Sequence, residues 1–283
     1  NNGDKLIEHG SRNALVRACV QLTASPNHAR AIVLNGGGAM APMWGGLDAL
    51  VRYIESEPEE IIVLPSSFWP ADAMHHVRLA LECSSTKLTL FARERESYQR
   101  LLDIFGGAAN IALGHDMAFD LNARYLEELR SNFRQRTPYA LIVERRDAEA
   151  STSIRVDKGW SVPFKHYVPI GLKRIVKRAL HHRLAHDTEF ARTCIQKIDD
   201  HHIASGRVIY ADVSQVTEFP FGEFLAAVID ANVVFTTRLH VAIVRHIVGK
   251  LCYLQPTGGE YRKNESVFEH SMRDAGYVRL LEP

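Results

Sequence analysis

The clearest structural signal in this sequence is the stretch NVVFTTRLHVAIVRHIVGK, residues 232–250. Its first four residues form a short apolar run, which is typical of a buried strand. Thr236 and Thr237 follow and are favoured N-cap residues, so a helix should begin there. Val and Ile residues then recur at helical spacing, and Gly249 stands where a helix commonly ends. The stretch therefore predicts a strand that leads directly into a largely buried helix.

Arg238 and His240 are unexpected in the first turn of such a helix. Amides in that turn have no partner within the helix and the helix dipole is positive there, so cations are disfavoured. A bound phosphate or carboxylate would remove the conflict, because amides, a guanidinium and an imidazole could all contact it. The alternative is that Arg238 pairs with a neighbouring acid and that His240 is a structural histidine. The spacing alone leaves both interpretations open.

The same alternation of apolar runs and helical patterns extends through most of the chain. The expected strands lie at residues 31–34, 61–64, 88–91, 110–113, 139–143, 207–212, 232–235 and 251–254. Helical patterns lie at residues 46–56, 94–105, 221–231 and 239–249. Strands alternating with helices predict an α/β fold with parallel sheets. Residues 147–206 are polar and rich in Arg and His, and we interpret them as helices with a long loop.

The two series of strands predict two Rossmann-like domains. We place the N-terminal domain at residues 1–135 and the C-terminal domain at residues 136–283, joined near residues 131–138. Folds of this kind bind ligands at the carboxyl ends of their strands. The active site is therefore expected in the cleft between the domains.

Composition excludes several classes of protein. The chain has 283 residues, of which 46% are apolar, so it can form a sizeable core. Lys and Arg total 34 against 33 Asp and Glu, which argues against a nucleic-acid-binding surface. Four scattered cysteines without a CxxC pair indicate a reduced, cytoplasmic protein. The sequence contains no signal-peptide pattern and no apolar run near the ~18 residues that span a bilayer.

Small and basic residues follow several of the predicted strands. These residues are Gly37, Gly38, Ser66, Ser67, Arg93, Arg145 and Arg146. Each position is ordinary by itself, and a glycine run is most often a tight turn. Because the carboxyl ends of parallel strands share one edge of a sheet, the set as a whole favours an anionic ligand there.

Several blocks, taken in order, resemble the polysaccharide pyruvyl transferase family. They are NNGDKLI, VLNGGGAM, VLPSSF, FARERESY, LGHDMAF, ERRD, TTRLHVAI and EYRKNES. The resemblance extends from residue 1 to about residue 268, and the RLH block is its most specific part. It implies a GT-B-like arrangement with the acceptor on the N-terminal domain and phosphoenolpyruvate on the C-terminal domain. It also implies a first strand ahead of the NNGD block, which would precede residue 1, and residues 147–206 match least.

The resemblance further implies an activity. Enzymes of this family transfer pyruvate from phosphoenolpyruvate to two hydroxyls of a sugar, which forms a cyclic ketal and releases phosphate. Phosphoenolpyruvate is a co-substrate, and we expect neither a further cofactor nor a metal. The expected acceptor is a bacterial cell-surface polysaccharide or its lipid-linked precursor. A basic stretch at residues 172–186 is a candidate for peripheral contact with the inner face of the plasma membrane.

Roles for single residues follow from the same resemblance. Phosphoenolpyruvate carries a phosphate and a carboxylate, and Arg238 together with Arg145 or Arg146 is expected to bind them, with Arg93 and Lys263 as further candidates. His240 is expected to give a proton to the methylene carbon or to stabilise the departing phosphate.

The base that accepts the sugar hydroxyl proton is expected to be Asp4, with Asp116 and Asp147 as alternatives. Two other functions stay open from the sequence: a GT-B glycosyltransferase that uses a nucleotide sugar, and a non-catalytic glycan-binding relative of the same fold.

Overall fold

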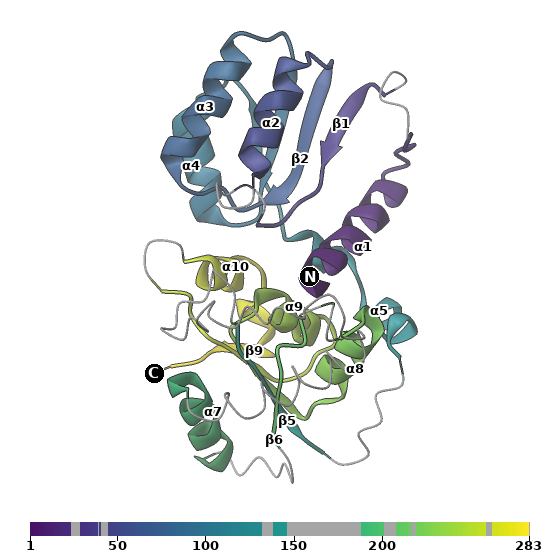
Figure 1. The fold of residues 1–283 in the computed structure, drawn as a ribbon, viewed down its shortest axis with the longest axis vertical. Helices are drawn as coiled ribbons and strands as arrows, with labels where there is room; N and C mark the ends of the chain where they lie inside the picture. The colour runs from purple at the N-terminus through teal and green to yellow at the C-terminus, as the bar shows by residue number, and fades with distance from the viewer. Residues whose placement is uncertain are drawn as a thin grey trace, which may run out of the picture. The chain divides into compact units, whose positions relative to one another are not determined.

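The computed structural model describes residues 1–23, 29–38, 40, 45–131, 138–145, 188–200, 208–214, 216, 219–258 and 262–282. The chain forms two compact units (Figure 1). The N-terminal unit comprises Asp4–Leu121 and Glu265–Ser271, and the C-terminal unit comprises Asn1–Gly3, Asn122–Asn264 and Met272–Pro283. No helix among the described residues has the length and apolar character that a membrane crossing requires.

The N-terminal unit contains a parallel sheet of four strands in the order β1-β2-β3-β4. The strands are β1 (Ala31–Leu34), β2 (Glu60–Ser66), β3 (Lys87–Ala92) and β4 (Asn110–Leu113). Helices α2 (Gly46–Glu55), α3 (Ala71–Glu82) and α4 (Arg95–Phe105) connect successive strands. Alternate residues of the central strands, such as Ile61, Val63, Leu88 and Leu90, pack with these helices in one core.

Helix α1 (Asn2–Arg17) and the 3-10 helix η3 (Met117–Asp120) complete the main part of this unit. Neither was predicted, because the NNGD block is rich in residues that favour turns. Inside α1, Gly10 lies so close to the backbone that a Cβ atom there would be 1.8 Å from the carbonyl oxygen of Met117. Glycine disfavours a helix by itself, but at this position the packing of α1 against η3 requires it.

The C-terminal unit contains a parallel sheet of five strands in the order β6-β5-β7-β8-β9. The strands are β5 (Ala140–Val143), β6 (Val208–Tyr210), β7 (Val233–Thr236), β8 (Cys252–Leu254) and β9 (Val278–Leu280). The other elements that begin in this unit are α5 (Ala123–Leu129), α7 (Glu189–Asp200), α8 (Phe221–Asp230), α9 (Leu239–Ile247), α10 (Lys263–Ser271) and η4 (Arg273–Ala275). Among the described strands, only β9 had no predicted counterpart, because the polar Arg279 interrupts its apolar pattern.

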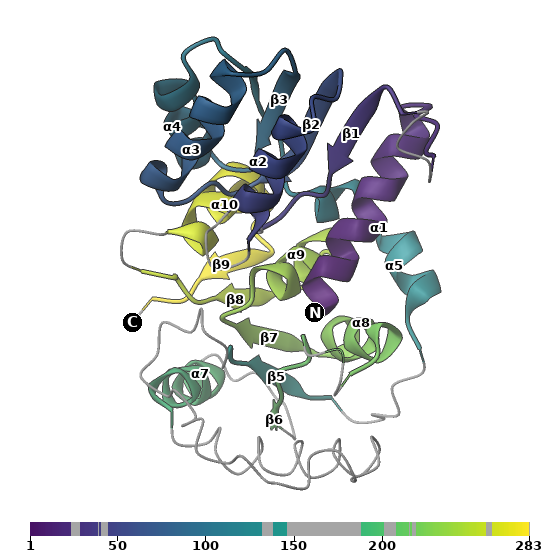
Figure 2. The same cartoon turned by 45° about the horizontal axis from the view of Figure 1, so that its top comes forward.

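Both faces of this second sheet are covered (Figure 2). Ala140, Ile142 and Phe235 pack with α7 in one core. The residues that alternate with them are also buried, and α9 contacts β7 and β8. This alternation explains why the strands have continuous apolar sequences. Two parallel α/β sheets are therefore confirmed, whereas the GT-B arrangement and the cleft stay predictions.

The strand order of the C-terminal unit contains a topological switch point. The chain leaves β5 for β6 on one side and later returns to β7 on the other side of β5. At such a point neighbouring strand ends diverge, and the crevice outside their carboxyl ends is the usual ligand site of open α/β sheets. The residues that follow β5 and β7 are Glu144, Arg145, Thr237 and Arg238.

Candidate functional site

Thr237 is the centre of the polar contacts at the switch point. Its Oγ1 accepts a hydrogen bond of 2.6 Å from the amide of Arg145, and its own amide donates to the carbonyl of Val143 at 3.0 Å. Its carbonyl accepts from Nδ2 of Asn264 at 3.3 Å. Thr237 thus connects the ends of β5 and β7 with the beginning of α10.

These contacts bring the backbone of three predicted cationic residues close to Thr237. Arg145 bonds to Thr237, Arg238 follows Thr237 in the chain, and Lys263 precedes Asn264. Arg145 and Lys263 are half-buried, while Arg146 lies outside the described residues. Asn264 itself is buried and also donates to the carbonyl of Gln255 at 2.9 Å. The sequence did not single out Asn264, because an asparagine in a polar block carries no spacing signal.

Arg238 is the N-cap residue of α9, with φ −101° and ψ 114°. The prediction that the helix begins at Thr236 or Thr237 is therefore wrong. Thr236 is still the last residue of β7, and its Oγ1 accepts from the amide of Arg238 at 2.9 Å instead of capping the helix. No side-chain hydrogen bond caps α9 at Arg238.

The Arg238 side chain forms a two-point ion pair with Asp212, which follows β6. Nε lies 3.2 Å from Oδ1 and Nη2 lies 2.5 Å from Oδ2, and the side chains are only 6% and 3% exposed. Of the two interpretations left open for Arg238, pairing with an acid is confirmed. Binding of an anion by Arg238 stays a prediction, and the fork of two bonds gives the guanidinium a fixed orientation.

His240 lies in the first turn of α9, as predicted, and is half-buried. Its ring packs against Gly3, where a Cβ atom would be 2.5 Å from Nδ1 and 2.9 Å from Cγ. Asp4, the predicted base, follows Gly3 in the first turn of α1 and is exposed. The roles of His240 and Asp4 stay predictions.

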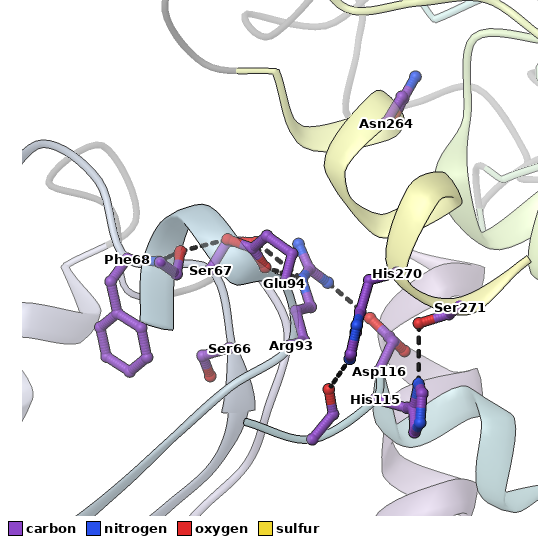
Figure 3. A network of polar contacts seen from close by, with 12 residues as sticks. Ser66, Ser67, Phe68, Arg93, Glu94, His115, Asp116, Asn264, His270 and Ser271 are labelled. Atoms are coloured by element: carbon purple, nitrogen blue, oxygen red, sulfur yellow. Dashed lines mark hydrogen bonds and ion pairs between the residues drawn. The ribbon is translucent and has the colours of Figure 1, made fainter. Parts of the chain in front are cut away.

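A second polar network lies at the carboxyl end of the sheet in the N-terminal unit (Figure 3). Ser67 Oγ accepts from Nε of Arg93 at 2.8 Å and donates to Glu94 Oε2 at 3.0 Å. Nη1 of Arg93 lies 2.6 Å from Oδ2 of Asp116. Asp116 Oδ1 accepts from the amide of Ala118 at 3.0 Å, which caps η3. Burial raises the pKa of Glu94, and this effect outweighs the opposing charge of Arg93.

The predicted ligands Ser66, Ser67 and Arg93 have no exposed surface in this network. The Ser66 hydroxyl donates to the carbonyl of Leu64 at 2.8 Å, so it bonds to the backbone near the end of β2. Asp116 is only 1% exposed, and its position in an ion pair does not suit the general base that was its alternative role. Direct contact of these side chains with a substrate stays a prediction.

Gly37 also has a structural task in this unit. Its amide donates to the carbonyl of Pro65 and its carbonyl accepts from the amide of Ser67, both at 2.9 Å. These bonds extend the pairing of β1 and β2 beyond Leu34. The φ angle of Gly37 is +115°, and a Cβ atom would lie 2.6 Å from Cδ1 of Ile7. Gly38 follows and is half-buried.

Two stacked histidines in the N-terminal unit had no predicted role. The rings of His115 and His270 are 4.7 Å apart with an interplanar angle of 13°. Nδ1 of His115 is 2.9 Å from the hydroxyl of Ser271, and Nε2 of His270 donates to the carbonyl of Gly114 at 2.9 Å (Figure 3). Burial, and secondarily the neighbouring His270, lowers the pKa of His115.

A cavity of about 380 Å³ lies beside His115. It is lined by Leu64, Pro65, Phe91, Gly114, His115, Asp116, Met117, Phe119 and Asp120.

Across the described part of the chain, no group of three or more His, Cys, Asp or Glu side chains is placed to hold a metal ion. The residues at the switch point include arginine, lysine and histidine beside a helix N-terminus, and this set suits an anionic ligand.

The model of the family described as polysaccharide pyruvyl transferase matches residues 6–250. No curated protein matches the chain. A crystal structure of a functionally uncharacterized protein from Klebsiella pneumoniae subsp. pneumoniae is similar, with a TM-score of 0.62 and 16% identity over 100% of this chain and 89% of that one. That likeness supports the fold alone. The family match includes β5, β7 and the first turn of α9, and the chain therefore belongs to the polysaccharide pyruvyl transferase family.

Proposed function

We propose that this protein transfers pyruvate from phosphoenolpyruvate to two hydroxyls of a sugar. One observation carries the proposal within the family. Thr237 at the switch point accepts hydrogen bonds from the backbone amide of Arg145 and from Asn264, the chain neighbour of Lys263. Arg238 follows Thr237 and is the N-cap residue of α9, so three cationic residues lie close to one helix N-terminus. Phosphoenolpyruvate has two anionic groups, so it needs several cations or amide donors at once.

In the proposed reaction, the methylene carbon of phosphoenolpyruvate takes up a proton and C2 becomes electrophilic. One sugar hydroxyl adds to C2, the C2–O bond to phosphate breaks, and the second hydroxyl adds to close the ketal ring. Of the two hydroxyl protons, one replaces the proton that the methylene carbon took up and the other ends on the leaving phosphate oxygen, so the phosphate departs as HPO4²⁻ and the carboxylate stays on the ketal. His240 is the proposed acid or phosphate stabiliser, because an imidazole can exchange a proton near neutral pH.

The acceptor is proposed to be a saccharide, in keeping with the family. A lipid-linked precursor, and attachment to the inner face of a membrane, stay predictions because the basic stretch at residues 172–186 lies outside the described residues. Asp147 lies outside them as well, so both Asp4 and Asp147 stay candidates for the base.

The test is phosphate release from phosphoenolpyruvate with a panel of saccharide acceptors. Wild type should release phosphate only with an acceptor, and His240→Ala should lose this release while it keeps the wild-type Tm. His246→Ala is the matched control, because His246 is a half-buried histidine in the last turn of the same helix. An active His240→Ala variant would remove His240 from the mechanism.

A binding assay separates the donors. Phosphoenolpyruvate at 100 times its Kd should stabilise the protein by about 2.7 kcal/mol, and a nucleotide sugar should not. Stabilisation by a nucleotide sugar alone would overturn the proposal in favour of glycosyl transfer.

A further inference from the structure

The N-terminal end of α9 carries Arg238 at the N-cap and His240 in the first turn, and it has no side-chain cap. A helix end without a side-chain cap is less firmly held than a capped one. Arg238 and His240 can then present one fixed geometry to a ligand only if other parts of the chain hold them in place. Two such supports contact this turn, one at each of the two residues.

The first support is Asp212. Its carboxylate forms the fork to Arg238, and Oδ1 also lies 3.4 Å from the amide of Ser214. Because both carboxylate oxygens are engaged and the side chain is buried, the position of Arg238 depends on the course of residues 212–214.

The second support is the N-terminal block. The amide of Asn2 donates to the carbonyl of Ser214 at 2.8 Å, and Nδ2 of Asn2 donates to the carbonyls of Val213 and Phe219, both at 2.9 Å. Asn2 has no exposed surface. The next residue is Gly3, whose lack of a side chain leaves room for the His240 ring.

The contacts close a ring through three distant parts of the sequence. It passes from Arg238 to Asp212, along residues 212–214 to Asn2, through Gly3 to His240, and back along α9. We propose that Asn2, Gly3 and Asp212 form a brace whose task is to position Arg238 and His240 for the ligand. All three are positioning residues. Only the reaction that the ligand undergoes is taken from the proposed function; the positioning itself does not depend on it.

The variants follow from the contacts. Asn2→Ala removes two hydrogen bonds of the brace, and Asn13→Ala is its matched control, because Asn13 lies on the same helix and donates one bond to the carbonyl of Asp120 at 2.7 Å. Gly3→Ala places a methyl group against the His240 ring. Alanine favours a helix by about 1 kcal/mol over glycine, so this change should not weaken α1 itself.

The deciding measurement is the NMR spectrum of the protein labelled with 13C-histidine, without substrate. The ring signals of His240, assigned with His240→Ala, should shift or broaden in Asn2→Ala and Gly3→Ala. They should stay in place in Asn13→Ala, and those of His246 should stay in place throughout. Unchanged His240 signals in both brace variants would overturn the inference, whatever reaction the protein catalyses.

Turnover supplies the second readout. Asn2→Ala and Gly3→Ala should lower kcat by about 10- to 100-fold with little change in the KM for phosphoenolpyruvate, while their Tm stays near that of Asn13→Ala. Adding Gly3→Ala to His240→Ala should cause no further loss, because the two changes act on one group. Full kcat in both brace variants would overturn the inference, whereas absence of any turnover in wild type would overturn only the proposed function.

Discussion

Nη1 of Arg93 lies 2.6 Å from Oδ2 of Asp116, and neither side chain has any exposed surface. Arg93 follows β3 and Asp116 follows β4, so the pair joins two strand ends inside the N-terminal unit. A charge buried this deeply depends on its partner, because water cannot replace it.

Arg93→Met should therefore lower the free energy of unfolding by about 3–5 kcal/mol, since it leaves the Asp116 carboxylate buried without its cation. The double variant Arg93→Met with Asp116→Leu should recover much of this loss. Urea denaturation of the single and the double variant measures this recovery. Arg124→Met is the control, because Arg124 is 89% exposed and its i,i+4 pair with Glu128 should contribute less than about 1 kcal/mol. Equal losses of unfolding free energy in Arg93→Met and Arg124→Met would contradict the prediction that a buried partner contributes more than an exposed one.

Gly37→Ala should also destabilise the protein, for two separable reasons. Alanine disfavours φ near +115°, and its Cβ would lie 2.6 Å from Cδ1 of Ile7. Gly107 has φ +99° and nothing within 4 Å of the added Cβ, so Gly107→Ala has the backbone cost alone, about 1–2 kcal/mol. We expect Gly37→Ala to lose about 1–3 kcal/mol more than this control in urea denaturation. Ile7→Val, which removes Cδ1, should reduce that difference.

Arg245 is a buried arginine whose partners are backbone carbonyls. Nη1 donates to Ala231 and Nη2 to Leu251, both at 2.8 Å, and the side chain reaches Val228 at 3.1 Å. Burial lowers the pKa of Arg245 to about 10. Arg245→Met should lower the free energy of unfolding by about 3–5 kcal/mol, because these carbonyls at the end of α8 and before β8 lose their donor.

The thermal midpoint of Arg245→Met measures this loss, with Arg12→Met as the control at a side chain that is 71% exposed. A midpoint close to that of the control would show that water replaces the guanidinium.

The stacked histidines predict a dependence on pH. Because burial lowers the pKa of His115 below that of the unfolded chain, the folded state binds fewer protons in the interval between the two values. The stability that His115 contributes is therefore present above about pH 6.5 and falls as the pH decreases through its folded pKa.

His115→Gln should reduce the loss of Tm between pH 7.5 and pH 5.5, by no more than about 3 °C because the group is partly exposed. His9 and His246, whose pKa values burial also lowers, remain in both proteins, so the difference belongs to His115. An equal or larger loss of Tm in the variant would contradict the predicted sign.

Most strands of the fold could be predicted from local sequence. β1 and β4 begin and end at the predicted residues 31–34 and 110–113, and the other matched strands differ only at their ends. The reason is physical: a strand buried on both faces of a parallel sheet needs an unbroken apolar run, which is visible in the sequence. α1 was missed because its Asn and Gly residues are chosen for contacts with distant segments rather than for helix formation.

The candidate site was predictable only in part. The sequence indicated Arg238 and His240 through their conflict with a helix N-terminus, and the structure places Arg238 at the N-cap and His240 in the first turn of α9. It gave no sign of Asp212, which lies 26 positions from Arg238, or of the bond from Asn2 to Val213 across 211 positions. Position after a strand also predicted ligand contacts for Ser66, Ser67 and Arg93. In the structure these three residues are fully buried.

The sequence by itself determined which segments are strands except β9, which residues follow them, and which family the chain resembles. Only the tertiary structure decided which strand ends adjoin and which charges are paired. Periodicity is a property of neighbouring residues, since it reflects the local geometry of a helix or strand. Pairing depends on strand order, and the order β6-β5-β7-β8-β9 is what brings Asp212, Arg145 and Arg238 to one edge of one sheet.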